Sequence, residues 1–313
     1  DEALRFITGF GDIFVAIGLL LFLGATAYFG ESISGPVGMG AAVTVASWGL
    51  AEYFTRIRRM ALPSILLLVI FAGAVFVLAA ALLSTLTGEA IAYRWTAFDH
   101  PAMQAIAALV TAAAIALHYR RFEVPITIAA GVAALVGAFL ALLASADMLE
   151  AVATPVVLAC GVVVFALAMR YDLSDPQRLT RRTDIAFWLH MLAAPLIVHT
   201  LVIGFLPGAG GSEAGSAIGT LAIFAVLAAI AVLVDRRAVL VSGLGYAGFA
   251  FGTLVQKSGL TDSIAPLTML ALGGFVLLLS AGWHPLRRAI VARLPDRLAR
   301  RLPRIGADDN TLR

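Results

Sequence analysis

Two histidines in one apolar stretch are the residues best suited to chemistry in this chain. His190 and His199 lie within 184–206, and ionisable side chains at membrane depth are functional candidates by default. A spacing of nine residues is about 180° around a helix of 3.6 residues per turn. One metal ion therefore cannot bind both side chains from one face of the helix.

Pro195 lies between the two histidines and is expected to kink their helix by removing a backbone hydrogen bond. A kinked helix with histidines on either side of the bend could line a polar pathway, because histidine can carry protons near neutral pH. In the alternative interpretation, each histidine bonds to a neighbouring backbone carbonyl and joins two helices.

Two carboxylates complete the candidate pathway residues. Glu52 precedes Arg56 by one helical turn, a spacing that allows an ion pair and is more typical of a structural role. Asp12 lies near the start of the first apolar stretch, where the helix dipole favours negative charge and local capping.

With Cys160 as the single cysteine and no nucleotide-binding, metalloprotease or nucleophile-elbow motif, we predict no catalytic residue, metal or cofactor.

The composition shows which solvent must surround these residues. Hydrophobic residues are 61% of the chain and charged residues 13%, against about 45–50% and about 25% in soluble domains. We therefore predict an all-α, polytopic integral membrane protein with short loops. A span needs about 20 apolar residues, and ten stretches qualify: 6–29, 36–54, 62–86, 101–117, 124–145, 149–169, 184–206, 217–234, 238–255 and 264–283.

Arginine clusters set the expected orientation of these spans, because basic residues of short loops stay on the cytoplasmic side. With ten spans every cluster falls inside, and only Arg94 and Lys257 fall outside. Both termini are therefore predicted to be cytoplasmic, in the inner membrane of a bacterium. The net charge of +3 follows from this topology and does not indicate nucleic-acid binding.

We predict one transmembrane domain over 1–284, followed by a cytoplasmic tail over 285–313. Within the domain, Arg59, Arg121 and Arg182 are 62 and 61 residues apart (121 − 59 and 182 − 121), which favours repeated helical hairpins of about 60 residues. A rival division gives two halves of five helices, inverted relative to each other, as is common in transporters.

The tail is expected to lie on the membrane surface. Apolar residues recur there at spacings of four, which predicts a basic amphipathic helix on the anionic inner leaflet. No aromatic residue is interleaved, so nucleic acid is not an expected partner. Six arginines are expected to bind anionic lipids: Arg287, Arg288, Arg293, Arg297, Arg300 and Arg301.

Two short runs resemble segments of uncharacterised bacterial multi-pass membrane proteins. They are FITGFGDIFVAIGLLLFLGA at 6–25 and VDRRAVLVSGLGYAGFAFG at 234–252. The resemblance implies a membrane location and carries no known activity. The helix count is similar to that of drug and metabolite exporters, although no motif of that family is present.

Three functional hypotheses remain open from the sequence. The first is a small-molecule or ion permease with its pathway near the helix of His190 and His199. The second is a non-catalytic scaffold or subunit that binds another membrane protein or a second copy of itself. The third, an enzyme acting on lipid, requires His190, Glu52 and Asp12 to converge on one cavity.

Overall fold

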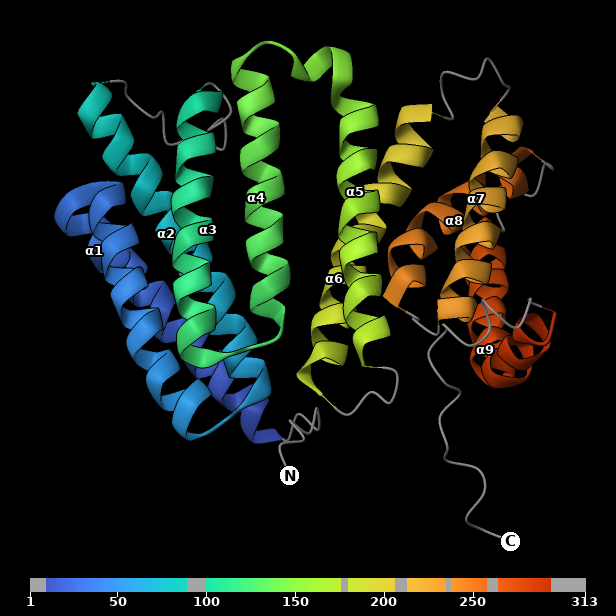
Figure 1. Ribbon diagram of the computed structural model, residues 1–313, viewed down its shortest axis with the longest axis horizontal. Helices are drawn as coiled ribbons and strands as arrows, with labels where there is room; N and C mark the ends of the chain where they lie inside the picture. Colours follow the sequence, from blue (N-terminus) through green and yellow to red (C-terminus); the bar gives the residue numbers. More distant parts are fainter. Residues whose placement is uncertain are drawn as a thin grey trace, which may run out of the picture. The chain divides into compact units, whose positions relative to one another are not determined.

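The computed structural model describes residues 10–88, 100–175, 180–205, 213–234, 238–257 and 264–293. All regular secondary structure in these segments is helical (Figure 1), which confirms the all-α prediction. The nine α-helices of this part of the chain are α1 (Phe10–Ala51), α2 (Ala61–Thr87), α3 (Pro101–Phe122), α4 (Ile126–Ser145), α5 (Leu149–Ser174), α6 (Arg181–His199), α7 (Glu213–Val234), α8 (Ala238–Lys257) and α9 (Ile264–Val291). Two π-helical segments, η1 (Glu52–Ile57) and η3 (Thr200–Phe205), continue α1 and α6.

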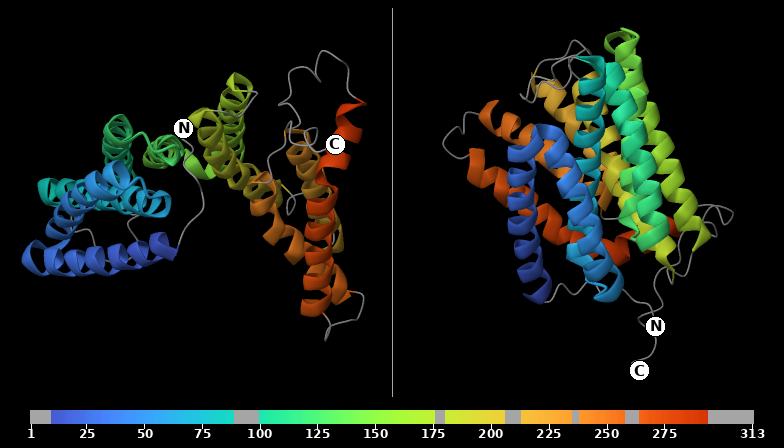
Figure 2. Two further views of the ribbon diagram at one scale, coloured as in Figure 1. Left: turned by 90° about the horizontal axis from the view of Figure 1, so that it is seen from below. Right: turned by 90° about the vertical axis from the view of Figure 1, so that its left-hand side faces the viewer.

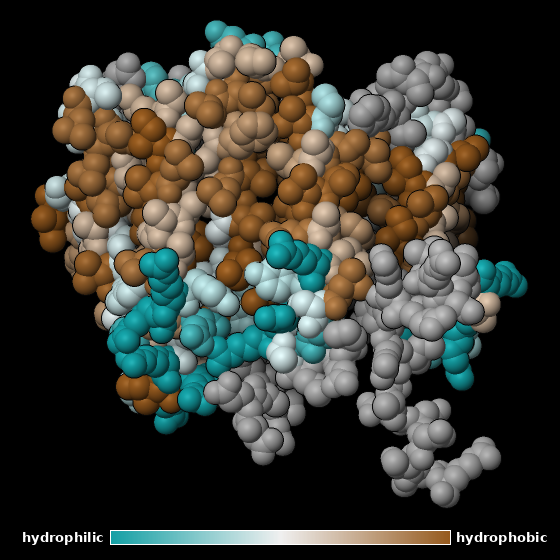
Figure 3. Space-filling view, viewed as in Figure 1, coloured by the Kyte–Doolittle hydropathy of each residue, from teal (hydrophilic) through white to brown (hydrophobic). Residues whose placement is uncertain are grey.

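The chain is an integral multi-pass membrane protein by composition. Eight helices within the described segments are long and apolar enough to cross a membrane. The first of the eight, Phe10–Ile57, contains most of the two predicted spans 6–29 and 36–54, whereas α8 is not among the eight. Apolar side chains such as Leu21 and Leu277 are exposed on the helices, and apolar residues cover much of the face shown in Figure 3.

The long helix α1 consists of two arms joined by a reversal. Ser34 and Gly35 leave helical geometry, and Gly35 has φ 58° and ψ −146°, a conformation that is essentially restricted to glycine. Pro36 then begins the second arm. Leu19 and Leu23 of the first arm share one core cluster with Ala51 of the second, and Figure 2 shows the arms side by side.

Contacts divide the chain into two compact units, Asp1–Ala153 and Thr154–Arg313. In unit 1, α2 packs against α1 and α3, and α4 packs against α3. A Cβ atom added to Gly40 would lie 2.8 Å from the backbone N and Cα of Leu78. The second arm of α1 and helix α2 therefore approach each other closely, as small residues permit in membrane helices.

Unit 2 contains α6 to α9 and most of α5. Its core includes Val198 of α6, Val232 of α7 and Trp283 of α9. A Cβ at Gly161 of α5 would lie 2.8 Å from Ile197 Cγ1 of α6, so these two helices are also close. Helix α5 runs through Ser174, and α9 runs through Pro285 to Val291, each beyond the end predicted for its span.

Candidate functional site

A buried histidine–aspartate pair joins α5 and α6. The Nε2 atom of His190 lies 2.8 Å from Oδ2 of Asp172, and both side chains are almost fully buried, at 0% and 1% exposure. A carboxylate only accepts, so Nε2 of His190 donates this hydrogen bond. The other ring nitrogen, Nδ1, is buried and has no hydrogen-bond partner among the described residues, and the ring of Phe165 packs at 5.1 Å between centroids.

Asp175 holds the end of α5 against the start of α6. Its Oδ2 accepts hydrogen bonds from Thr180 N at 2.8 Å, Thr180 Oγ1 at 2.7 Å and Thr183 Oγ1 at 3.1 Å. Thr180 also caps α6, because its hydroxyl accepts from the backbone N–H of Arg182 at 3.3 Å. These bonds fix the two helices so that Asp172 faces His190.

His199 lies on a different face of α6. Its side chain is exposed, and its Nδ1 shares a hydrogen bond with the hydroxyl of Tyr246 on α8. Pro195, between the histidines, is exposed and the helix continues through it. In the described segments each histidine therefore bonds to a side chain of another helix, and not to a backbone carbonyl as in the alternative sequence interpretation.

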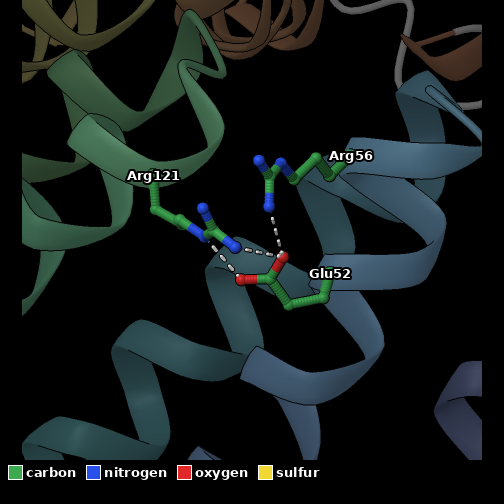
Figure 4. Close-up of polar contacts among 3 residues, drawn as sticks. All are labelled: Glu52, Arg56 and Arg121. Atoms are coloured by element: carbon green, nitrogen blue, oxygen red, sulfur yellow. Dashed lines mark hydrogen bonds and ion pairs between the residues drawn. The ribbon is translucent and has the colours of Figure 1, made fainter.

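Glu52, the first residue of η1, is the centre of an ion-pair cluster in unit 1 (Figure 4). Arg121 of α3 donates from Nε to Oε1 at 2.7 Å and from Nη2 to Oε2 at 3.0 Å. Arg56 donates from Nη1 to Oε2 at 3.4 Å. The pair with Arg56 matches the sequence prediction, while the bidentate partner Arg121, 69 residues away in the chain, was not predicted.

The geometry of this cluster predicts unequal effects of its two arginines on stability. Arg121→Ala is expected to lower the Tm of the detergent-solubilised protein by a few degrees, because it removes two charge-assisted bonds between α3 and η1. Arg56→Ala, which removes one long bond within a single helical turn, is expected to leave the Tm almost unchanged. Equal shifts in a thermal unfolding assay would contradict this assignment.

The two units share one arrangement of polar contacts. Unit 1 has five helical arms in its described part, namely the two arms of α1 and helices α2 to α4, and unit 2 has five, α5 to α9. In unit 1, Glu52 at the end of the second arm bonds to Arg121 on the fourth arm, α3. In unit 2, His199 at the end of the second helix, α6, bonds to Tyr246 on the fourth, α8. Each of these contacts lies at a π-helical segment. Glu52 is the first residue of η1, and His199 directly precedes η3.

Asp12 lies in the first turn of α1 and is half-buried, where a carboxylate is favoured by the helix dipole. It belongs to unit 1 with Glu52, whereas the partner of His190 is provided by α5 of unit 2. The residues that the structure describes contain no group of three His, Cys, Asp or Glu side chains placed to hold a metal ion.

Asp172 is a candidate site residue that the sequence does not reveal, because the predicted span 149–169 ends before it. The structure shows a buried stripe on α5 formed by Gly161, Val164, Ala168 and Asp172. Their spacings of three, four and four residues are those of one helix face. That periodicity continues past Arg170 and was the available sign that Asp172 lies in the helix.

The predicted lipid-binding arginines separate into different environments. Arg288 and Arg293 are exposed, whereas Arg287 is 1% exposed within the chain. Arg287 lies one helical turn after Trp283, which is buried in the core of unit 2, so both side chains fall on the same face of α9. Arg297, Arg300 and Arg301, and Arg94, which the sequence places on the outer side, lie outside the described residues.

Comparisons of the chain with protein-family models, with curated proteins and with solved structures found no match.

Proposed function

We propose that the chain is a small-molecule or ion permease whose pathway follows α6. The observation that carries the proposal is the buried pair of His190 and Asp172, which places two ionisable groups inside an apolar helix bundle. Buried ion pairs contribute little to stability when compared with well-packed apolar residues. A role in moving a proton or a polar solute explains why these two residues occur in the bundle, whereas a contribution to stability does not.

A second polar level lies on the other face of α6, where His199 contacts α8. His199 lies nine residues after His190, which is about 14 Å along the axis at 1.5 Å per residue. Its bond to Tyr246 adds a titratable group and a hydroxyl at that level. The π-helical segment η3 begins at the next residue, Thr200, and such segments are frequent at functional sites.

We also propose ten crossings, with both termini in the cytoplasm of a bacterium and the chain in its inner membrane. The two arms of α1 supply two crossings, and α8 supplies the crossing that composition alone leaves out. The distribution of arginine clusters supports this count, because a missing crossing would place every later cluster on the opposite side.

The matching contacts of the two units support this function. Each unit joins its second and fourth helices through a polar pair beside a π-helical segment. With ten crossings the second helix of unit 1 runs inward and that of unit 2 runs outward. The proposed halves are therefore inverted repeats, an architecture common among secondary transporters.

Flux through purified protein in liposomes tests the proposal. We would load liposomes with a pH-sensitive dye, set the membrane potential with potassium and valinomycin, and add sodium, chloride, phosphate or neutral amino acids in turn. At least one class is expected to give a flux that is absent from empty liposomes. His190→Gln keeps a donor for Asp172 and cannot carry a proton, so it is expected to reduce that flux by about tenfold or more.

His284→Gln is the matched control, because His284 is an exposed histidine of α9 outside the proposed pathway. It is expected to leave the flux unchanged. Absence of flux for every class, or full flux in His190→Gln, would overturn the proposal.

A non-catalytic scaffold is the second candidate function, and two observations favour it. The members of each described polar pair bond to one another within the fold, and a cavity of about 470 Å³ in unit 2 is lined by apolar residues. A scaffold is expected to show no flux, to copurify with one stable membrane partner, and to retain that partner in the variants His190→Ala and His199→Ala.

A further inference from the structure

The second ring nitrogen of His190 is a buried hydrogen-bond acceptor. Because Nε2 donates to Oδ2 of Asp172, Nδ1 of the neutral imidazole carries a lone pair. Nδ1 is buried and has no hydrogen-bond partner among the described residues. Buried polar atoms are normally bonded to protein, to water or to an ion, so this nitrogen points to a ligand.

Apolar side chains surround the imidazole. The buried stripe of α5 consists of Gly161, Val164 and Ala168 before it reaches Asp172, and the other buried residues of α6 are isoleucine, alanine, leucine and valine. The ring of Phe165 packs 5.1 Å from that of His190 between centroids. The ligand of Nδ1 must therefore be small, and it must bind through few protein groups.

A proton fits these surroundings better than a metal cation. Sodium sites of transporters use backbone carbonyls that are freed where a membrane helix is broken. Helices α5 and α6 are continuous at Asp172 and at His190, so their carbonyls are engaged in the helices. A proton needs only the lone pair of Nδ1.

We infer that the ion that drives the proposed permease is a proton, and that it binds at Nδ1 of His190. The inference rests on the proposed function and names its ion. On binding, the lone pair of Nδ1 forms an N–H bond and the imidazole becomes an imidazolium, whose charge is compensated by the carboxylate of Asp172, 2.8 Å from Nε2. On release the bonding electrons stay on Nδ1, so the site carries one proton per cycle.

Asp172 is the charged group that faces this site. The buried charged residues that the structure describes in unit 2, besides His190, are Asp172, Asp175 and Arg287. Asp175 bonds to the start of α6, and Arg287 lies on α9 in the turn after Trp283. On α8, Tyr246 bonds to His199 on the other face of α6, and the described side chains of α7 include no titratable group.

Nitrogen NMR of the full chain, labelled with ¹⁵N at its histidines, tests where the proton binds. The variant His190→Gln identifies the His190 signals by their absence. As the pH is lowered over the range in which the protein stays folded, Nδ1 of His190 is expected to gain a proton while Nε2 stays protonated in its bond to Asp172. A lone pair that persists at Nδ1 over this whole range would overturn the inference.

Asp172→Asn tests the compensating charge. The asparagine keeps an oxygen acceptor for Nε2 and removes the carboxylate, so Nδ1 is expected to take up its proton at a lower pH than in wild type. Asp147→Asn makes the same change at an exposed aspartate of unit 1 and is expected to titrate as wild type does. Equal titration of Nδ1 in Asp172→Asn and wild type would contradict the role of the pair as a proton site.

A pH gradient across the liposomes tests whether this proton drives transport. The solute class that gives a flux is expected to follow the imposed gradient, and the internal dye is expected to record protons moving with it. Solute flux without proton movement would overturn the inference and leave the proposed function standing. Absence of any flux would overturn both, and the NMR titration, which does not depend on flux, tells the two failures apart.

Discussion

Replacing His190 alone with leucine is expected to destabilise the protein more than replacing His190 and Asp172 together. The single change leaves the carboxylate of Asp172 buried without its histidine partner, and breaking a buried ion pair from one side typically costs about 3–5 kcal/mol. The double leucine variant removes both members of the buried pair, which is often neutral or stabilising. Unfolding in detergent, followed by tryptophan fluorescence against denaturant, measures the three free energies.

The same three proteins separate structure from function. A functional pair predicts that the double variant regains stability and still lacks flux in liposomes. With Asp172→Leu measured as a fourth protein, a double variant that is as unstable as the sum of the two single variants would show that the two side chains contribute independently. A double variant with normal flux would remove the pair from the pathway.

Replacing Gly40 with alanine is expected to separate the second arm of α1 from α2. The new Cβ would lie 2.8 Å from backbone atoms of Leu78, so a side-chain rotation cannot relieve the overlap and the helices must move. Overpacking of this kind costs about 1–3 kcal/mol. Thermal unfolding of Gly40→Ala in detergent is expected to show a clear decrease in Tm.

Gly49→Ala is the control from the same arm. A Cβ at Gly49 meets no atom within 4 Å, and alanine is favoured over glycine in a helix interior by about 1 kcal/mol. The Tm of Gly49→Ala is therefore expected to stay equal or to increase. A decrease of the same size in both variants would show that the close approach at Gly40 does not limit stability.

The positions of the helices could be read from the sequence because lipid imposes a length and a composition on each one. Nine α-helices account for the ten predicted stretches within the described residues, since α1 contains two of them. The ends of the helices were harder to predict, because a polar residue ends the apolar run of the sequence without ending the helix. Helix α5 continues past Arg170 in this way and brings Asp172 into the bundle.

Two short segments with matching sequences form different turns. The junctions RRMALP at 58–63 and RRFEVP at 120–125 match in sequence. Pro63 lies within the first turn of α2, whereas Pro125 precedes α4 and Arg59 and Glu123 take the left-handed conformation at different positions of the motif. The second segment also carries a cross-helix contact, from Arg121 to Glu52, that a match in sequence does not record.

Cross-helix partners could not be found from sequence spacing. A pair within one helical turn, such as Glu52 and Arg56, follows from periodicity alone. The contacts of Glu52 with Arg121 and of His199 with Tyr246 join residues 69 and 47 positions apart. Their formation depends on which helices pack together, and one sequence carries no direct record of that choice.

The reversal at Ser34 and Gly35 has a consequence for biogenesis. It joins the arms 10–33 and 36–51 with almost no connecting chain, so the two arms can enter the bilayer as one hairpin during synthesis. In the proposed topology, deleting the arm 10–33 would leave an odd number of crossings and reverse the sidedness of every later arginine cluster. The cell would then have to translocate those clusters or leave a helix uninserted, so this short turn would determine the orientation of the whole nascent chain.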